Sequence, residues 1–236
     1  RKGVATLLKT TSTPAGLRIA LRVLARLLDY PDAQLRPQVG ELLQALAEEN
    51  VLGKDRLAEL HALGRQLAQH DMYALQERYV ETFDRGRQTS LHLFEHIHGD
   101  SRERGPALLD LAQTYEKAGL LFNAPELPDH LGVVLEFAST QPAALAREFL
   151  GEMTHILNAL FTALLQRQSP YASVIAAILE AAGEKAQAVP LAPEPDMDEA
   201  WAEPEPFDGC TNQGQNRPSP QTVRKTRSQS SQGVAP

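Results

Sequence analysis

LRIALRVLARLL, at residues 17–28, is the clearest structural signal in the chain. Its leucines at positions 17, 21, 24 and 28 recur at spacings of three and four residues, which places them on one face of a helix. The arginines at positions 18, 22 and 26 lie on other faces. The Asp-Tyr-Pro-Asp run that follows ends the helix, because Pro31 disfavours helical geometry in the residue before it. The pattern predicts an amphipathic helix with one face in a core.

The same kind of pattern continues to residue 188. Apolar periods predict further helices over residues 37–49, 54–70, 72–83, 91–96, 107–118, 131–139, 143–168 and 171–188. Helix formers dominate the composition, valine and isoleucine are scarce, and no run alternates with period two for long enough to predict a strand. We therefore predict an all-α fold, a single-domain bundle of about nine helices.

Composition narrows the class of protein. The chain has 236 residues, which suffice for one substantial core, and a formal net charge of −7. Its one cysteine, Cys210, excludes a disulfide framework and a cysteine-based metal site built by this chain alone. No stretch approaches the roughly 18 to 20 apolar residues of a membrane span, and residues 5–8 are too short for a signal-peptide core. We expect a soluble protein that is not exported and does not insert into a membrane, and the single cysteine is compatible with a reducing cytoplasm.

The C-terminal fifth of the chain differs from the rest. Residues 190–208 hold seven acidic residues without Lys or Arg, whereas residues 209–236 hold four basic residues without an acid. Half of the sixteen prolines also lie there, so this segment buries too little apolar surface to offset its ordering entropy. We predict an N-terminal extension without assigned function at 1–16, a helical domain at 17–189 and a disordered tail at 190–236. Four bases without aromatics are a weak nucleic-acid footprint, so we expect no nucleic-acid partner.

The densest group of polar and aromatic residues is YVETFDRGRQTSLHLFEHIHGDSRERG, residues 79–105. His92 and His96 stand at i,i+4 with Glu95 nearby, so a zinc site is one interpretation. The glutamate of an HExxH motif and a third ligand are both missing, and we prefer a structural role for the two imidazoles. The density of charge beside glycines and aromatics is typical of a recognition surface.

A second polar cluster, ELPDHL, occupies residues 126–131. Asp129 is placed to stabilise the N-terminus of the helix that follows, and His130 can be oriented by either neighbouring acid. An Asp-His pair also occurs in hydrolytic triads, but no Ser or Cys stands in a nucleophile elbow and no glycine-rich phosphate loop is present. We predict a binding protein that is not an enzyme and that binds no metal or cofactor of its own.

At these residues the sequence resembles a known family. The segment at 79–111, the ELPDHLGVVLEF at 126–137 and the LLDYPD at 27–32 are similar to the nitrate reductase delta subunits. These are molybdenum cofactor assembly chaperones, and they belong to the wider TorD-like chaperone family. The resemblance extends over roughly residues 17–188 in order and spacing.

The resemblance implies a cytoplasmic chaperone of all-helical fold that performs no catalysis. Members bind the N-terminal segment of the apo catalytic (alpha) subunit of respiratory nitrate reductase, keep it competent for molybdenum cofactor insertion and delay its membrane docking. Molybdenum cofactor biosynthesis proteins are further implied partners. Two alternatives stay open: a chaperone for a dimethyl sulfoxide or trimethylamine oxide reductase, and a metal- or nucleotide-dependent helical enzyme.

The client segments of this family are basic and amphipathic, so we expect an apolar groove rimmed by carboxylates. In this hypothesis Tyr79, Phe83, Leu93 and Phe94 line or support the groove, and Asp84, Glu95, Glu126 and Asp129 supply negative charge. Arg87, His96 and His130 complete the expected client-binding set. The alternative is that the aromatic residues belong to the core and that only the acids contact a client.

Overall fold

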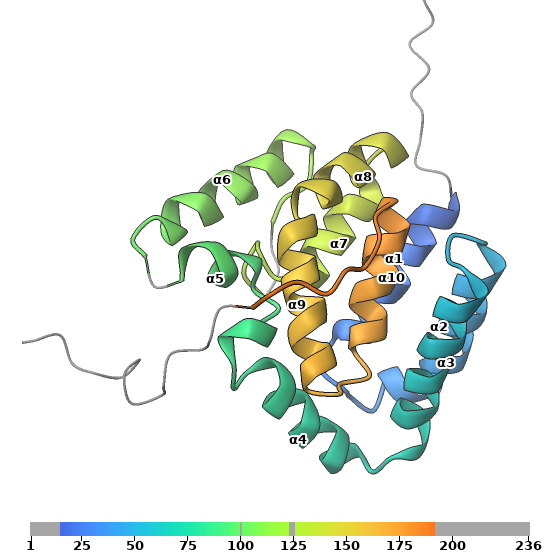
Figure 1. Ribbon diagram of the computed structural model, residues 1–236. Helices are drawn as coiled ribbons and strands as arrows, with labels where there is room; N and C mark the ends of the chain where they lie inside the picture. The colour runs from blue at the N-terminus through green and yellow to red at the C-terminus, as the bar shows by residue number, and fades with distance from the viewer. Residues whose placement is uncertain (1–14, 100, 123–125, 192–236) are drawn as a thin grey trace, which may run out of the picture. The chain divides into compact units, whose positions relative to one another are not determined.

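The computed structural model describes residues 15–99, 101–122 and 126–191, and all regular elements among them are helices (Figure 1). They are α1 (Ala15–Leu28), α2 (Leu35–Glu48), α3 (Lys54–Gln69), α4 (Met72–Phe83), the 3-10 helix η1 (Arg87–Thr89), α5 (Leu93–His98), α6 (Arg104–Lys117), α7 (Leu131–Thr140), α8 (Ala143–Glu152), α9 (Thr154–Gln166) and α10 (Ala172–Ala182). This confirms the all-α prediction. Cys210, most of the predicted tail and most of the predicted N-terminal extension lie outside the described residues.

The core forms where α1 and α10 meet their neighbours. The leucine face of α1 is buried as predicted, and α1 packs against α7, α10 and α2. Helix α10, with the sequence ASVIAAILEAA, is apolar on nearly all sides and is buried along its whole length except at Glu180. A helix that is apolar all round belongs inside a protein. The other helices therefore surround α10 on several sides.

The structure corrects the single helix predicted for residues 143–168. Two helices, α8 and α9, occupy this stretch, and the chain turns between them at Met153, which has φ −94° and ψ 2°. Leu150 of α8 and Leu157 of α9 are both completely buried, and both helices pack on α10. The turn lets two consecutive apolar faces reach the same central helix, which the helical period of the sequence does not reveal.

The prediction of a helix over residues 171–188 is wrong beyond residue 182. Gly183 ends α10 in a left-handed conformation with φ +92°, a common way for a helix to stop. Residues 184–191 then cross α9 without regular structure (Figure 1). The N–H of Gln187 donates to Asn158 Oδ1 at 2.8 Å, and the N–H of Val189 donates to Thr162 Oγ1 at 3.0 Å. These bonds explain two buried polar side chains on α9.

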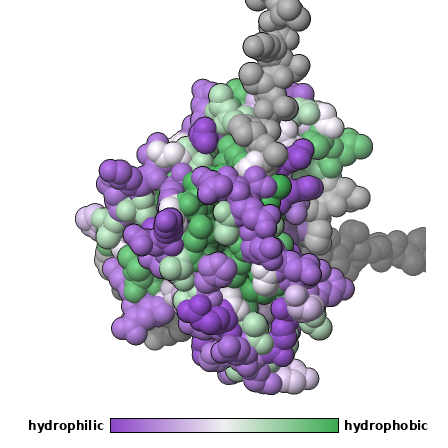
Figure 2. Space-filling model, turned by 90° about the vertical axis from the view of Figure 1, so that its right-hand side faces the viewer, coloured by the Kyte–Doolittle hydropathy of each residue, from purple (hydrophilic) through white to green (hydrophobic). Residues whose placement is uncertain are grey.

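Helix α6 lies apart from the main core and contributes to a smaller apolar cluster with Leu111, Tyr115 and Phe137 at its centre. Figure 2 shows the face on the right-hand side of Figure 1, where polar side chains cover most of the surface and apolar ones gather near its middle. None of the helices in the described part of the chain is long and apolar enough to span a membrane.

Candidate functional site

The two polar clusters of the sequence meet at Asp129, whose side chain is completely buried. Its Oδ2 accepts a hydrogen bond from the N–H of Phe94 at 3.0 Å, and its Oδ1 lies 3.3 Å from Nδ1 of His92. The Asp129 carbonyl also accepts the N–H of Leu93 at 3.1 Å. Asp129 therefore stabilises the first turn of α5, which lies about 35 residues earlier in the chain.

This arrangement corrects the prediction that Asp129 stabilises the helix that follows it. The N-cap of α7 is His130, whose Nδ1 accepts the N–H of Gly132 at 3.2 Å. The backbone at His130 is extended and pairs with the backbone at His92, and successive side chains of an extended chain point in opposite directions. Asp129 is consequently turned toward α5 while His130 remains with its own helix.

The charges of these groups are tuned by their surroundings. Burial alone would raise the pKa of Asp129, but hydrogen bonds from His92 and from the N–H of Phe94 outweigh it, and the pKa is lowered. The hydrogen bond to Asp129 raises the pKa of His92. Burial lowers the pKa of His130, and the nearby His92 lowers it further. Only one of the two neighbouring imidazoles is thus favoured in the charged form.

We expect the contribution of His92 to stability to depend on pH. Because the pKa of His92 is higher in the folded state, its contribution is complete below the unfolded value of about 6.5 and is lost as pH rises through the folded value. The difference in unfolding free energy between wild type and His92→Gln should therefore narrow from pH 5.5 to pH 8.5. Urea denaturation measures it, with the exposed His61→Gln as control. A difference that is constant or widens with pH would contradict the ion pair.

Three other predicted site residues hold α5 in place. Nε of Arg87 donates to the carbonyl of Glu95 at 3.1 Å, and His96 Nε2 lies 2.9 Å from the Ser90 carbonyl oxygen. The Glu95 carboxylate forms an ion pair with Arg104 at 3.0 Å. Arg87, Glu95 and His96 thus have partners that join η1, α5 and the start of α6 to one another.

Gly99 makes room for the Arg87 guanidinium, which occupies the place that a Cβ at residue 99 would take. Its φ of +55° is also one that residues with a side chain rarely adopt. Gly99→Ala should therefore lower the free energy of unfolding by about 2 kcal/mol, measured by urea denaturation. The control is Gly151→Ala in α8, where nothing lies near the added methyl group. Because alanine favours a helix more than glycine does, this change should raise the free energy of unfolding by at most about 1 kcal/mol. Equal effects of both changes would disprove this account.

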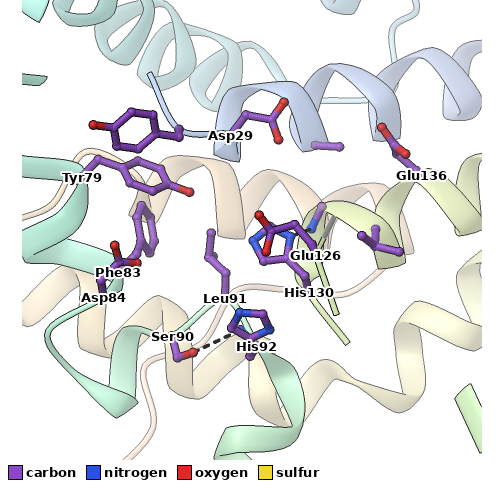
Figure 3. A pocket seen from close by; sticks show the side chains of 14 residues that line it. Asp29, Tyr79, Phe83, Asp84, Ser90, Leu91, His92, Glu126, His130 and Glu136 are labelled. Carbon is purple, nitrogen blue, oxygen red and sulfur yellow. Dashed lines mark hydrogen bonds between the residues drawn. The ribbon is translucent and has the colours of Figure 1, made fainter. Parts of the chain in front are cut away.

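A pocket of about 390 Å³ lies beside His92 and His130, at the ends of α1 and α4 and the start of α7 (Figure 3). It is lined by Ala25, Asp29, Tyr30, Tyr79, Phe83, Asp84, Ser90, Leu91, His92, Glu126, His130, Gly132, Val133 and Glu136. Its volume lies in the range of pockets that bury a ligand of drug size. The lining comes from three stretches that are far apart in the sequence, residues 25–30, 79–92 and 126–136.

The pocket carries negative charge. Among the described residues that line it, four are carboxylates and none is a lysine or arginine. Asp29 is paired with Arg26 at 2.9 Å. Asp84, Glu126 and Glu136 have no ion pair within the described part of the chain. A cationic ligand would therefore gain electrostatic energy on entering the pocket.

Aromatic rings form one wall of the pocket. Tyr79 and Phe83 are mostly buried, with ring centroids 4.7 Å apart, and Tyr30 packs edge-on against Tyr79 at 5.5 Å. The hydroxyl of Tyr79 donates to the Leu28 carbonyl at 2.6 Å. Tyr79 and Phe83, two of the three aromatic residues singled out in the sequence, therefore belong to the core and also border the pocket. Whether they contact a client stays a prediction.

The structure brings five of the predicted site residues together around the pocket: Tyr79, Phe83, Asp84, Glu126 and His130. The other six, Leu93, Phe94, Asp129, Arg87, Glu95 and His96, do not line it. Leu93 and Asp129 are completely buried, and Phe94 is partly buried against both apolar clusters. The part that any of these residues plays in binding a client stays a prediction.

Sequence reasoning missed Asp29, Tyr30, His92 and Glu136 as pocket residues. Asp29 and Tyr30 belong to the LLDYPD segment that carries the family resemblance, but their only predicted role was to end a helix. Glu136 is the one charged residue of α7, LGVVLEFAST, and this isolation within an apolar helix was the available signal. Among the described residues, no three or more His, Cys, Asp or Glu side chains are placed to hold a metal ion.

Comparison with solved structures identifies the fold. A crystal structure of a candidate redox enzyme maturation protein from Archaeoglobus fulgidus matches this fold with a TM-score of 0.51 and 23% identity. The match covers 68% of this chain and 90% of that one. At this level of identity the likeness concerns the fold alone. The chain thus has the all-helical fold of that maturation protein.

The chain belongs to the nitrate reductase delta subunit family, whose model matches residues 32–177. The nitrate reductase molybdenum cofactor assembly chaperone NarJ of Escherichia coli K12 is 44% identical over 167 residues, which are 70% of each chain. A candidate NarJ of Bacillus subtilis is 34% identical over 166 residues, 70% of this chain and 88% of that protein. The family resemblance seen in the sequence is confirmed.

Proposed function

We propose that this protein is a cytoplasmic chaperone for the assembly of respiratory nitrate reductase. It binds the N-terminal segment of the apo catalytic subunit, keeps that subunit competent for molybdenum cofactor insertion and delays its docking at the membrane. The role is one of binding and timing and requires no catalytic group. Family membership, and the E. coli relative described as a nitrate reductase molybdenum cofactor assembly chaperone, support the assignment.

The observation that carries the proposal is the acidic pocket with its aromatic wall. A basic, amphipathic segment has two features that such a site recognises, positive charge and apolar side chains. The three carboxylates without an ion pair, Asp84, Glu126 and Glu136, attract the charge, and Tyr79 and Phe83 offer apolar surface. A segment held in this pocket is withheld from other partners while the cofactor is inserted.

Calorimetric titration tests the proposal. The protein is titrated with a peptide matching the N-terminus of the nitrate reductase catalytic subunit, beside a scrambled peptide and the N-terminal peptide of a dimethyl sulfoxide reductase. We expect selective binding of the first peptide with a negative heat-capacity change, because apolar surface is buried. Equal binding of all three peptides, or binding of none, would remove the client assignment. Preference for the third would assign the chaperone to a different molybdoenzyme.

A further inference from the structure

One end of the pocket combines aromatic rings with carboxylates. Tyr79, Phe83 and Asp84 lie together on one side of the pocket, and Asp29 lies above them in the view, at the end of α1 (Figure 3). Tyr30 belongs to the same lining and keeps 48% of its surface exposed, although its ring packs against Tyr79. A half-exposed ring, Tyr30, and a carboxylate that has no ion pair within the described residues, Asp84, thus line the same pocket, with Tyr79 in contact with the Tyr30 ring.

Two helices end at this side of the pocket. Helix α1 ends at Leu28 and α4 ends at Phe83, and an aspartate follows each directly in the chain, Asp29 and Asp84. The C-terminus of a helix carries partial negative charge, so both helix ends add to the field of the carboxylates. Arg26 offsets much of the charge of Asp29, whereas that of Asp84 is available to a ligand.

Burial and the same negative charges raise the pKa of the Tyr79 hydroxyl. Burial raises its pKa most, and the neighbouring Tyr171 raises it further. Asp29, Asp84 and Glu126 each raise the pKa again. Three carboxylates from three different segments therefore act on the hydroxyl of Tyr79, which belongs to the aromatic wall.

We propose that this end of the pocket is an arginine subsite, which takes the guanidinium of one arginine of the client segment between Tyr30 and Asp84. This inference rests on the proposed function and deepens it. A guanidinium is planar, stacks on aromatic faces and presents paired N–H donors to a carboxylate. A lysine ammonium satisfies the charge but lacks the fork and the flat face. Glu126 and Glu136, the other two pocket carboxylates without an ion pair within the described residues, are left for other parts of the client.

Modified client peptides test the subsite. In the peptide that matches the N-terminus of the nitrate reductase catalytic subunit, each arginine is replaced in turn by citrulline, its neutral isostere, and by lysine. A further peptide is acetylated at its α-amino group. We expect one arginine whose citrulline form binds about 10-fold to 30-fold more weakly, with a smaller loss for lysine. Acetylation should change the dissociation constant by less than about twofold.

Variants of the protein identify where that arginine binds. Tyr30→Leu and Asp84→Asn should each weaken the unmodified peptide by about 5-fold to 20-fold. The matched controls on α4 are Tyr73→Leu, at a tyrosine that is 82% exposed, and Glu77→Gln, at an exposed acid outside the pocket. Both controls should leave binding unchanged. On Asp84→Asn, the effect of citrulline should shrink below about threefold, because the two changes remove the same contact.

The outcomes separate this inference from the proposed function. If the unmodified peptide binds selectively but every citrulline form binds equally well, the subsite is wrong and the chaperone function stands. If only acetylation weakens binding, the cation at this site is the α-amino group and the arginine assignment is overturned. If citrulline has the same effect on wild type and on Asp84→Asn, the arginine binds elsewhere. If the unmodified peptide does not bind, the proposed function fails and the subsite with it.

Discussion

Replacing Asp129 with alanine is expected to lower the free energy of unfolding by about 3 kcal/mol. The carboxylate is completely buried, and it accepts the N–H of Phe94 while it pairs with His92. Its removal leaves the N-terminus of α5 without that acceptor and removes a charged partner of a partly buried imidazole. The change also removes the side-chain hydrogen bonds that Asp129 makes to residues 92 and 94, which join the polar cluster at 126–131 to the one at 79–105. Urea denaturation at pH 6 measures the effect.

A graded series makes this experiment decisive. Asp129→Asn retains an oxygen that can accept the N–H of Phe94 but loses the charge, so we expect about half the destabilisation of the alanine variant. Asp110→Ala, at an exposed acid of α6, should change stability by less than about 0.5 kcal/mol. If Asp129→Ala proves no more harmful than Asp110→Ala, the buried link does not hold α5.

The largest effect on binding is expected from reversing two charges of the pocket. Asp84→Lys combined with Glu126→Lys should weaken the nitrate reductase peptide by about 100-fold, because two attractive interactions become repulsive. Neither side chain has an ion pair within the described residues, so their replacement should leave the fold intact. Calorimetric titration at two salt concentrations measures the effect, which should shrink as salt screens the charges.

The matched control changes the net charge by the same amount elsewhere. Glu77→Lys combined with Glu116→Lys reverses two exposed acids outside the pocket. This variant should weaken the peptide by less than about fivefold, which is the share of long-range attraction. Equal losses in the two double variants would show that overall charge, rather than the pocket, governs binding. An unchanged affinity in the pocket variant would exclude these two acids from the client site.

Much of the fold followed from patterns within single segments. The leucines of α1 are buried as their spacing predicts, and α4 lies at the predicted residues 72–83. The errors occur where distant packing overrides the local pattern. Residues 143–168 keep one helical period, yet the chain turns at Met153 so that α8 and α9 both reach α10. Residues 184–188 have ordinary helix formers, but Gly183 ends the helix before them.

For the site, the sequence supplied the residue types but not their neighbours. It pointed to Asp84, Glu126 and His130, which do line the pocket. It also grouped Glu95 and His96 with them, although neither lines the pocket. Glu95 pairs with Arg104, and His96 contacts the carbonyl of Ser90. A residue and its contacts across the fold are separated by many positions, and a single sequence carries no periodic signal for such contacts.

The sequence by itself determined that this protein is all-helical, which faces of its helices are apolar and to which family it belongs, because helical periodicity and linear motifs are properties of contiguous residues. Only the tertiary structure decided that Asp129 serves α5 rather than α7. It also decided that Asp29, Tyr30 and Glu136 face the same pocket. These relations depend on how packed helices bring remote segments to within a few ångströms of one another, and that follows from the core as a whole.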